Sequence, residues 1–459
     1  MVQITFIEPK SELPSPLGQL PWTKSLPMMG SVILGTILDK NGYNVKIYKE
    51  YLKEPDYSKL QSDYLCIYSM TNTFPRAVKI AYEFRKNNPN SKIIIGGPHV
   101  NFVPEDALNL KYNNDYLIDH VVTSEADNII VDIIKGKYKK RLIHGAPNLN
   151  LDELPRINLS LLQGLSNKFD WFPMSTSRGC PFSCKFCSVT KMFGTKFRFR
   201  SPDVVVNDII SAQEKYNFNG IFFYDDNFFA NPNRGNELLK KMAEKNIKKS
   251  FFTQTRIDVA KHDDILRNLG KVSDNVTLFL GFESINDKTL QLYNKRQTFD
   301  EIKSAIKKIK SYNYKIMGAF VLGSDDDDKF AAKRTADFCD DMDIDYPQFT
   351  VLTPLPGTDL YADLESQNRI FNRDWSMYDV AHVVYKPLKM SASELQASFV
   401  DAYRSVYSYT NKRLLRHFFG DVRNIKYLFD FKWLKMRNVL NNIIDEKLDY
   451  IKYLEKQNL

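Results

Sequence analysis

The feature of this sequence that most restricts its fold is a repeated alternation of short apolar runs with amphipathic helical stretches. In the first 145 residues the expected strands are 3–7, 44–48, 64–69, 92–96 and 120–123. Helical patterns occupy residues 28–41, 75–88 and 127–135, and Gly42 and Gly136 follow two of them as stop signals. Such alternation predicts an α/β domain over residues 1–145, a doubly wound, Rossmann-like parallel sheet with helices on both faces.

A second block of alternation follows a connector at residues 146–165, which contains Pro147 and Pro155 and has little periodicity. The strands expected in this block are 172–175, 220–224, 250–255, 276–282, 315–322 and 348–352. Six βα units are too few for a closed eight-stranded barrel, so we predict a partial, TIM-like (β/α)6 barrel over residues 166–370. Residues 371–459 form a mainly helical extension that includes an amphipathic helix at 391–409, with Ser391 and Glu394 as a capping box.

Three of the five cysteines, Cys180, Cys184 and Cys187, fall within eight residues. Thiolates are the usual ligands of iron–sulfur clusters, and a [4Fe–4S] cluster normally takes four of them. A loop with three cysteines therefore leaves one iron open to a small molecule. The alternative is a closed zinc site with a histidine as fourth ligand, but His144 and His262 are the nearest histidines and both are distant along the chain. The two remaining cysteines, at positions 66 and 339, are expected to be buried free thiols.

The cysteine loop resembles a known family. Residues 177–188 read SRGCPFSCKFCS, follow directly after the first expected barrel strand, and place an aromatic residue, Phe186, before the last cysteine. This run resembles the motif of the radical S-adenosylmethionine (radical SAM) superfamily. The resemblance implies that S-adenosylmethionine binds the open iron through its amino and carboxylate groups. It also implies that an electron from the cluster cleaves the sulfonium to methionine and a 5′-deoxyadenosyl radical, and that Phe186 covers the cluster.

Polar residues follow the expected barrel strands, at the face where barrel enzymes keep their sites. Each alone would be typical of a helix N-cap, but together with the cysteine loop they indicate a binding site for S-adenosylmethionine. An ammonium group needs a carboxylate, ribose hydroxyls need acceptors, and adenine needs an apolar shelf. By resemblance to the family, Asp225 and Asp226 bind the methionyl amino group, Glu283 and Ser284 contact the ribose, and the stretch from Gly318 packs on adenine; Arg256 completes the expected cofactor contacts.

The order of the segments resembles the cobalamin-binding subgroup of the superfamily. Residues 352–358 (LTPLPGT) support this resemblance, and residues 372–387 are similar to the C-terminal extension of hopanoid methylases and their relatives. The resemblance implies that the first domain binds cobalamin at the carboxyl ends of its strands. The residues expected there are Ser69, Thr71, Gly96, Gly97, Ser124 and Glu125. No histidine stands in the pattern Asp-x-His-x-x-Gly that supplies a cobalt ligand in the best-known cobalamin domains, although His99 follows a strand end.

The implied activity is methylation of an unactivated carbon, in which the radical removes a hydrogen atom and methylcobalamin delivers the methyl group. A second S-adenosylmethionine then remethylates cobalt. Two alternatives stay open: a radical cyclisation or rearrangement without methyl transfer, and a non-catalytic zinc-binding protein. The expected partners are a small-molecule or lipid substrate and an electron donor such as flavodoxin or ferredoxin.

The net charge of +9 does not point to nucleic acid, because residues 410–459 contain eleven Lys and Arg against six Asp and Glu. This basic tail accounts for most of the excess. No run of about 18 apolar residues and no signal peptide are present, so a cytoplasmic location is expected. Residues 413–437 alternate aromatic and cationic side chains, a pattern typical either of peripheral contact with an anionic membrane or of a helix packed on its own core.

Overall fold

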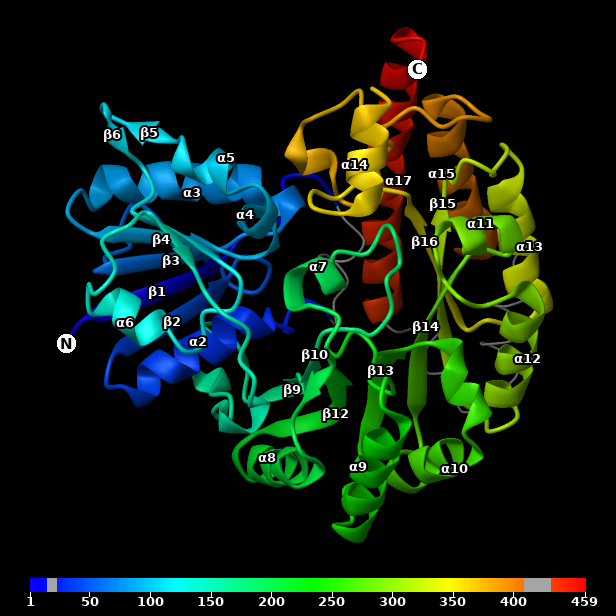
Figure 1. Ribbon diagram of the computed structural model, residues 1–459, viewed down its shortest axis with the longest axis horizontal. Helices are drawn as coiled ribbons and strands as arrows, with labels where there is room; N and C mark the ends of the chain where they lie inside the picture. The colour runs from blue at the N-terminus through cyan, green and yellow to red at the C-terminus, as the bar shows by residue number, and fades with distance from the viewer. Residues whose placement is uncertain (15–22, 408–430) are drawn as a thin grey trace.

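The computed structural model describes residues 1–14, 23–407 and 431–459, and two six-stranded parallel sheets dominate it (Figure 1). The first sheet has the strand order β2-β1-β3-β4-β7-β8. Its strands are β1 (Gln3–Glu8), β2 (Asn44–Lys49), β3 (Tyr64–Tyr68), β4 (Lys92–Gly96), β7 (His120–Thr123) and β8 (Leu142–His144). The five strands expected from the sequence are present, and β8 adds a sixth. The order of the strands reverses between β1 and β3, the position at which doubly wound sheets open a crevice for ligands.

Helices cover both faces of this sheet because its strands are apolar on both sides. Successive residues of β4 show the division: Ile93 and Ile95 pack with α3, whereas Ile94 packs with α2 and α6. The helices are α2 (Met29–Lys40), α3 (Phe74–Asn87), α4 (Pro98–Phe102), α5 (Pro104–Leu108) and α6 (Ile130–Ile134), and a small hairpin joins β5 (Lys111–Tyr112) to β6 (Asp115–Tyr116). The doubly wound N-terminal domain predicted from the sequence is confirmed.

The second sheet has the order β16-β15-β14-β13-β12-β9 and is open, since β9 and β16 do not pair with each other. Its strands are β9 (Lys168–Met174), β12 (Asn217–Phe223), β13 (Ser250–Thr255), β14 (Val276–Glu283), β15 (Lys315–Leu322) and β16 (Tyr346–Val351). Its helices are α8 (Pro202–Lys215), α9 (Pro232–Glu244), α10 (Asp263–Val272), α11 (Asp287–Leu292), α12 (Phe299–Lys310), α13 (Ala331–Asp341) and α14 (Asp359–Ser366). This confirms the predicted partial (β/α)6 barrel.

The inner, concave face of the open barrel is accessible, whereas its outer face is buried under the helices. In β15 and β16 every second residue is fully buried and the residues between are half-buried. Because side chains of a strand alternate between the two faces of a sheet, the half-buried set lies on one face. Met317, Ala319 and Gln348 belong to it. The barrel therefore presents an open concave surface toward the N-terminal domain (Figure 1).

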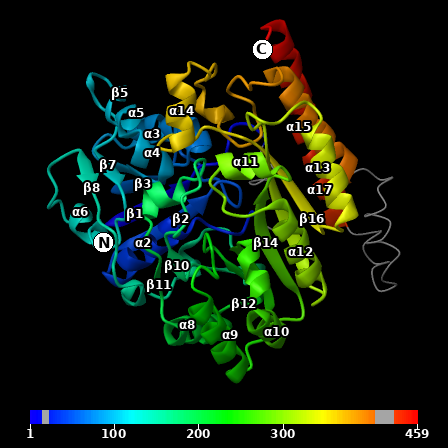
Figure 2. The same cartoon turned by 45° about the vertical axis from the view of Figure 1, so that its right-hand side comes forward.

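The C-terminal extension packs against the β16 edge of the barrel. There α15 (Ala392–Tyr407) contacts both α13 and α17 (Phe431–Lys456) (Figure 2). The predicted capping box is present, since Ser391 and Glu394 exchange hydrogen bonds between side chain and backbone N–H, both at 3.0 Å. Residues 413–430 of the predicted membrane-contacting tail lie outside the described residues, and for 431–437 the helical backbone alone is described. Among the described helices, none has the length and apolarity needed to span a bilayer.

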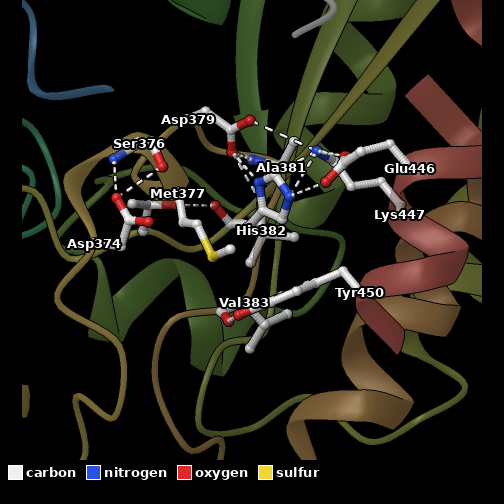
Figure 3. Close-up of polar contacts among 12 residues, drawn as sticks. Asp374, Ser376, Met377, Asp379, Ala381, His382, Val383, Glu446, Lys447 and Tyr450 are labelled. Atoms are coloured by element: carbon white, nitrogen blue, oxygen red, sulfur yellow. Dashed lines mark hydrogen bonds and ion pairs between the residues drawn. The ribbon is translucent and has the colours of Figure 1, made fainter. Parts of the chain in front are cut away.

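A buried cluster of four charged residues attaches α17 to the segment that precedes α15 (Figure 3). His382 lies between two carboxylates, with Nδ1 3.0 Å from Asp379 and Nε2 2.9 Å from Glu446. Lys447 Nζ lies 2.6 Å from Glu446 and 3.7 Å from Asp379. The side chains of Asp379, His382 and Lys447 are completely buried. Tyr450 donates a hydrogen bond to the carbonyl of Val383 and extends the attachment along α17.

Candidate functional site

The loop with the three cysteines lies between β10 (Ser177–Arg178) and α7 (Val189–Phe193), where the two sheets face each other (Figure 1). The barrel holds this loop through backbone groups. Lys185 donates from its N–H to the carbonyl of Tyr293 at 3.2 Å and accepts from the N–H of Leu360 at 3.1 Å. Asn294 Nδ2 donates to Ser183 O at 3.0 Å. Contacts from α11 and α14 therefore position a loop that has little regular structure of its own.

Cys180, Cys184 and Cys187 are half-buried free thiols, whereas Cys66 and Cys339 are buried elsewhere in the fold. Burial raises the pKa of Cys187 to about 12, and the charges of Cys184 and Cys180 add to the shift. Nearby thiols that raise one another's pKa are suited to a metal group, which removes their protons on binding.

The three thiols fit a cluster better than a single ion. In the described ranges, no three His, Cys, Asp or Glu side chains converge on a point where one metal ion could bind. A structural zinc ion requires four ligands that converge tetrahedrally, whereas each thiolate of a [4Fe–4S] cluster binds a different iron, so the thiolates stand further apart. The donor set therefore fits an iron–sulfur cluster with three protein ligands.

Asp225, at the end of β12, is buried and fully engaged with the segment that leads into the cysteine loop. Its carboxylate accepts hydrogen bonds from Thr176 N at 3.1 Å, from Thr176 Oγ1 at 2.8 Å and from the hydroxyl of Ser177. Burial raises its pKa, and the charge of Arg234 opposes that shift. Asp225 therefore ties the barrel to the start of the cysteine loop.

Asp226, the next residue, projects into open space and pairs with no cation in the part of the chain that the structure describes. Protein surrounds this space on most sides, so desolvation raises the pKa of Asp226 to about 7, and the adjacent Asp225 adds to the shift. Burial raises the pKa values of Cys180, Cys187 and Tyr68, and the charge of Asp226 adds to each shift. An acid with a perturbed pKa and no internal partner, facing the cysteine loop, is a candidate to bind a cationic ligand.

Glu283 ends β14 in a left-handed backbone conformation, with φ of +68°, that is unusual for any residue except glycine. Lys295 Nζ lies 2.7 Å from its carboxylate, and both groups lie over Gly281 on the concave face. Strained backbone that the surroundings maintain is concentrated at functional sites. Ser284 is buried, and its hydroxyl accepts the N–H of Asn286 at 3.0 Å.

Three other predicted cofactor residues have a role in packing. Arg256 lies with its guanidinium 3.9 Å from the ring centre of Phe182 in the cysteine loop and donates to the carbonyl of Lys295 at 2.6 Å. Phe186 packs edge-on against Tyr293, with 5.1 Å between ring centres. Gly318 faces the helix layer, because a Cβ there would lie 2.8 Å from the ring of the buried Phe282. Its missing side chain permits core packing on the convex face, and the contact of residues 318–323 with adenine stays a prediction.

The predicted strand-end residues of the N-terminal sheet lie at the edge that faces the barrel. Ser69 and Thr71 are buried, and the Ser69 N–H donates to the carbonyl of Gly96 at 2.8 Å. Gly97 has φ of +106°, and a Cβ there would meet Ser69 O at 2.7 Å. The loops after β3 and β4 therefore pack closely on each other, and Met70, which is 37% exposed, projects from this surface.

Ser124 is exposed, whereas Glu125 is buried in a link between the two domains. Glu125 accepts from Arg198 Nη2 and from Arg178 Nη1, each at 2.5 Å. Burial would raise its pKa, but Arg198 and Arg178 hold that pKa below its ordinary range. Because Arg178 lies two residues before Cys180, Glu125 connects the N-terminal sheet to the cysteine loop, and its hydrogen-bonding capacity is used within the protein.

His99 is fully buried and does not face the barrel. Its Nε2 lies 3.2 Å from Asp106, which also accepts from Trp375 Nε1 at 2.6 Å. The imidazole stacks on Phe74, with 4.1 Å between ring centres. These contacts attach the C-terminal extension to the N-terminal domain and leave His99 as a structural residue.

Sequence reasoning missed several residues of the interdomain region. Glu8 ends β1, and burial raises its pKa to about 7. Burial raises the pKa of Tyr68, at the end of β3, and the charges of Glu8 and Asp226 add to this shift. Burial also raises the pKa of Tyr224, at the end of β12, and the charges of Glu8 and Tyr68 add to that shift. The signal was available for Glu8, Tyr68 and Tyr224, since each stands at a strand end on the ligand-binding edge of its sheet. Lys295 follows a helix and had no such signal.

A cavity of about 300 Å³ lies between α2, the connector and α8. Its lining includes Arg200 and Asp208, which pair at 2.7 Å, and contains none of the predicted site residues. The cavity is therefore separate from the cysteine loop.

Comparison with known proteins agrees with this geometry. Residues 174–334 match the family model of the radical SAM superfamily. An uncharacterized methyltransferase of Pyrococcus horikoshii is 26% identical over 409 residues, which cover 83% of this chain and 88% of that protein. The hopanoid C-3 methylase of Methylococcus capsulatus is 24% identical over 422 residues, 86% of this chain and 79% of that protein. The structure of the cobalamin-dependent S-adenosylmethionine radical enzyme OxsB, with aqua-cobalamin and S-adenosylmethionine bound, has a TM-score of 0.66 at 15% identity and covers 100% of this chain and 81% of that chain. The cysteine loop, the open barrel and the family model show that residues 174–334 form a radical SAM domain, which uses a [4Fe–4S] cluster and S-adenosylmethionine.

Proposed function

We propose that this enzyme methylates an unactivated carbon of a small-molecule substrate and that its N-terminal domain holds cobalamin. The observation that carries the proposal is the position of the cysteine loop, between the open barrel and a doubly wound domain whose strand order reverses between β1 and β3 (Figure 1). Tyr68, Tyr224, Glu8 and Asp226 interact across this interface, so the two sites share one space. The likeness to methyltransferases over most of the chain supports the same reaction class.

The N-terminal edge fits cobalamin without a histidine on cobalt. The loops after β3 and β4 carry uncharged residues and pack closely through Ser69 and Gly97. Met70 projects from the loop after β3, and Ser124 projects from the loop after β7. His99 is unavailable because it is buried against Asp106. When bound, the cluster with S-adenosylmethionine supplies a 5′-deoxyadenosyl radical, and cobalamin supplies the methyl group.

The protein's own residues bind and orient these groups. Cys180, Cys184 and Cys187 hold the cluster, and Asp226 accepts the ammonium group of S-adenosylmethionine. Asp225 and Arg178 position the cysteine loop from the barrel side and the N-terminal side, respectively. Glu283, held by Lys295, offers a carboxylate oxygen to the ribose hydroxyls.

The test uses the full-length protein, reconstituted anaerobically with iron and sulfide and incubated with hydroxocobalamin and methyl-deuterated S-adenosylmethionine. We expect retained cobalamin, and after reduction we expect the deuterated methyl group in the cobalamin fraction by mass spectrometry. Met70→Asp should weaken cobalamin retention because it places a charge on the uncharged edge. Leu388→Asp, the control, changes an apolar residue outside that edge that is more exposed than Met70. Absence of cobalamin retention, together with normal cleavage to 5′-deoxyadenosine, would replace methylation with cyclisation or rearrangement.

Two further roles belong to this proposal. Flavodoxin or ferredoxin would supply the electron to the cluster, which reduction of the cluster by the purified protein partner tests directly. A lipid substrate would be reached by peripheral membrane contact through residues 413–437, and co-sedimentation with anionic liposomes tests that contact.

A further inference from the structure

A short segment, residues 23–28, crosses from the N-terminal domain into the open side of the barrel, and two charged side chains hold its backbone. Lys49, at the end of β2, donates to the carbonyls of Thr23 at 2.8 Å and Leu26 at 2.5 Å. Glu8, at the end of β1, accepts the N–H of Met28 at 2.9 Å. Both charged groups are buried, with 3% of Glu8 and 6% of Lys49 exposed. A buried lysine and a buried glutamate are therefore used to fix the path of six residues.

Because the backbone of residues 23–28 is held in this way, Leu26 lies against the concave face of the barrel. Leu26 is 3% exposed and forms one apolar cluster with Phe222 of β12 and Phe252 of β13. The two phenylalanine rings are stacked with 4.6 Å between their centres. The partly buried members of this cluster are Trp171, Tyr224, Phe279 and Met317. A leucine from the other domain thus lies on an aromatic floor halfway along the strands.

The next layer of the same face leads toward the cysteine loop. Residues two positions further along a strand lie on the same face, so Tyr224, Gln254 and Ala319 follow Phe222, Phe252 and Met317. All three are half-buried, and the side chains of Gln254 and Gln348 have no hydrogen-bond partner within the described residues. The space between Leu26 and the cysteine loop is therefore accessible and bounded by apolar groups and two amides.

If residues 23–28 served only to stabilise the fold, Leu26 would be expected to bury the residues that it contacts. Phe279, Met317 and Tyr224 remain partly exposed although Leu26 packs on the same cluster, so the segment covers the floor without filling the space above it. The strand residues of this layer are uncharged. The charged groups beside it are Glu283 and Lys295, which lie over Gly281 and pair with each other at 2.7 Å, and Asp226, which follows the end of β12. An uncharged apolar surface selects against charged ligands, since a buried charge without a partner is strongly disfavoured.

We propose that Leu26 is the floor of the substrate cavity and limits how far an uncharged, apolar part of the substrate enters the barrel, while Gln254 and Gln348 contact a carbonyl or hydroxyl of the substrate. This inference rests on the proposed function only in taking the concave face as the substrate side of the enzyme. Leu26 and the two glutamines are then specificity residues contributed by both domains. Lys49 and Glu8 act through the backbone of residues 23–28 and are positioning residues.

The test measures binding of the uncharged fluorophore N-phenyl-1-naphthylamine to the full-length, cluster-reconstituted protein with S-adenosylmethionine present. Leu26→Trp should weaken binding about tenfold or more, because it overfills the floor, and Leu26→Ala should strengthen binding or raise the number of probe molecules bound. Leu388→Trp, at an exposed leucine, is the matched control and should bind as the unmodified protein does. The anionic relative 8-anilino-1-naphthalenesulfonate should bind more weakly than the uncharged probe.

A second variant covers the case in which Leu26→Trp does not fold. Gln254→Glu adds a charge to the wall without a change in size, and it should weaken the uncharged probe while cluster absorbance and circular dichroism stay unchanged. Equal binding by all variants, or equal binding of the two probes, overturns the inference. The outcome is independent of the methylation test: loss of cobalamin labelling with intact probe selectivity removes the proposed reaction alone, and labelling with no probe selectivity removes the assignment of Leu26 alone.

Discussion

The protein contains two clusters of acidic groups that differ in how their charges are satisfied. In the C-terminal extension, Asp379 and Glu446 both lie within 4 Å of His382 and Lys447 (Figure 3). At the end of β12, Asp225 receives three hydrogen bonds, yet the exposed Asp226 beside it has no cationic partner among the described residues. The first cluster is complete by itself and holds a helix. The second cluster has an acid without a partner, which is favourable only when a cationic ligand arrives.

The largest effect is expected at the cysteine loop, which gives the incomplete cluster its function. Cys184→Ala should abolish the broad absorbance of the reconstituted cluster and the cleavage of S-adenosylmethionine, because two thiolates cannot replace three. Cys339→Ala, in the buried core of α13, is the control and should retain both. Full cleavage by Cys184→Ala would remove the cluster assignment.

Removing one member of the complete cluster should cost much of the stability of the C-terminal extension. Lys447→Met leaves Asp379 and Glu446 with one cation in a buried site, and we expect a loss of about 3–5 kcal/mol in the free energy of unfolding. Urea unfolding followed by circular dichroism measures it, and Lys452→Met, which removes an exposed ion pair on the same helix, should change little. Equal effects of the two variants would show that the buried cluster does not hold α17.

At the incomplete cluster the opposite behaviour is expected. Asp226→Asn should leave stability unchanged or raise it, because Asp226 is exposed, has no cationic partner among the described residues and lies beside the like charge of Asp225. The same change should weaken binding of S-adenosylmethionine by about 1.5–3 kcal/mol, the range for a hydrogen bond to a charged group. Isothermal titration of the reconstituted protein measures the affinity. Asp225→Asn is the informative neighbour, since it should reduce stability through the lost contacts to Thr176 and Ser177; a reversed pattern would exchange the roles of the two aspartates.

The smallest effect is a dependence of stability on pH from His382. Burial alone would lower its pKa, but Asp379 and Glu446 raise the pKa above its ordinary value of 6.5. A raised pKa in the folded state means that the contribution is complete below about pH 6.5 and is lost as pH rises through the folded pKa. Each tenfold increase in proton affinity corresponds to about 1.4 kcal/mol.

Unfolding of the wild type and of His382→Gln from pH 6 to 9 tests this dependence. The variant should show a flatter profile at the upper end. Asp379 and Glu446 have lowered pKa values, so their contributions are lost at acidic pH in both proteins and do not mask the difference. A parallel decline of the two profiles above pH 7 would show that other groups are responsible.

Local sequence patterns were sufficient for the strands, the open barrel and the cysteine loop. Hydrophobic periodicity acts over a few residues, and the three cysteines lie in one loop where chain connectivity alone brings them together. The pair Asp225 and Asp226 marks the limit of such reasoning. Neighbouring residues at a strand end point in opposite directions, so only the fold decides which one is tied to Thr176 and which one faces the thiols.

Only the tertiary structure decided which residues distant in the chain contact each other. The sequence indicates that Glu125 ends a strand, but its partners Arg178 and Arg198 lie 53 and 73 residues away, so the engagement of this carboxylate depends on how the domains meet. The same holds for Gly318, because only the fold shows that it lies on the face of β15 that packs against Phe282. It also holds for Leu26, which packs inside the barrel of another domain. Charged and apolar side chains have many chemically equivalent partners along the chain, and only proximity in the folded state selects among them.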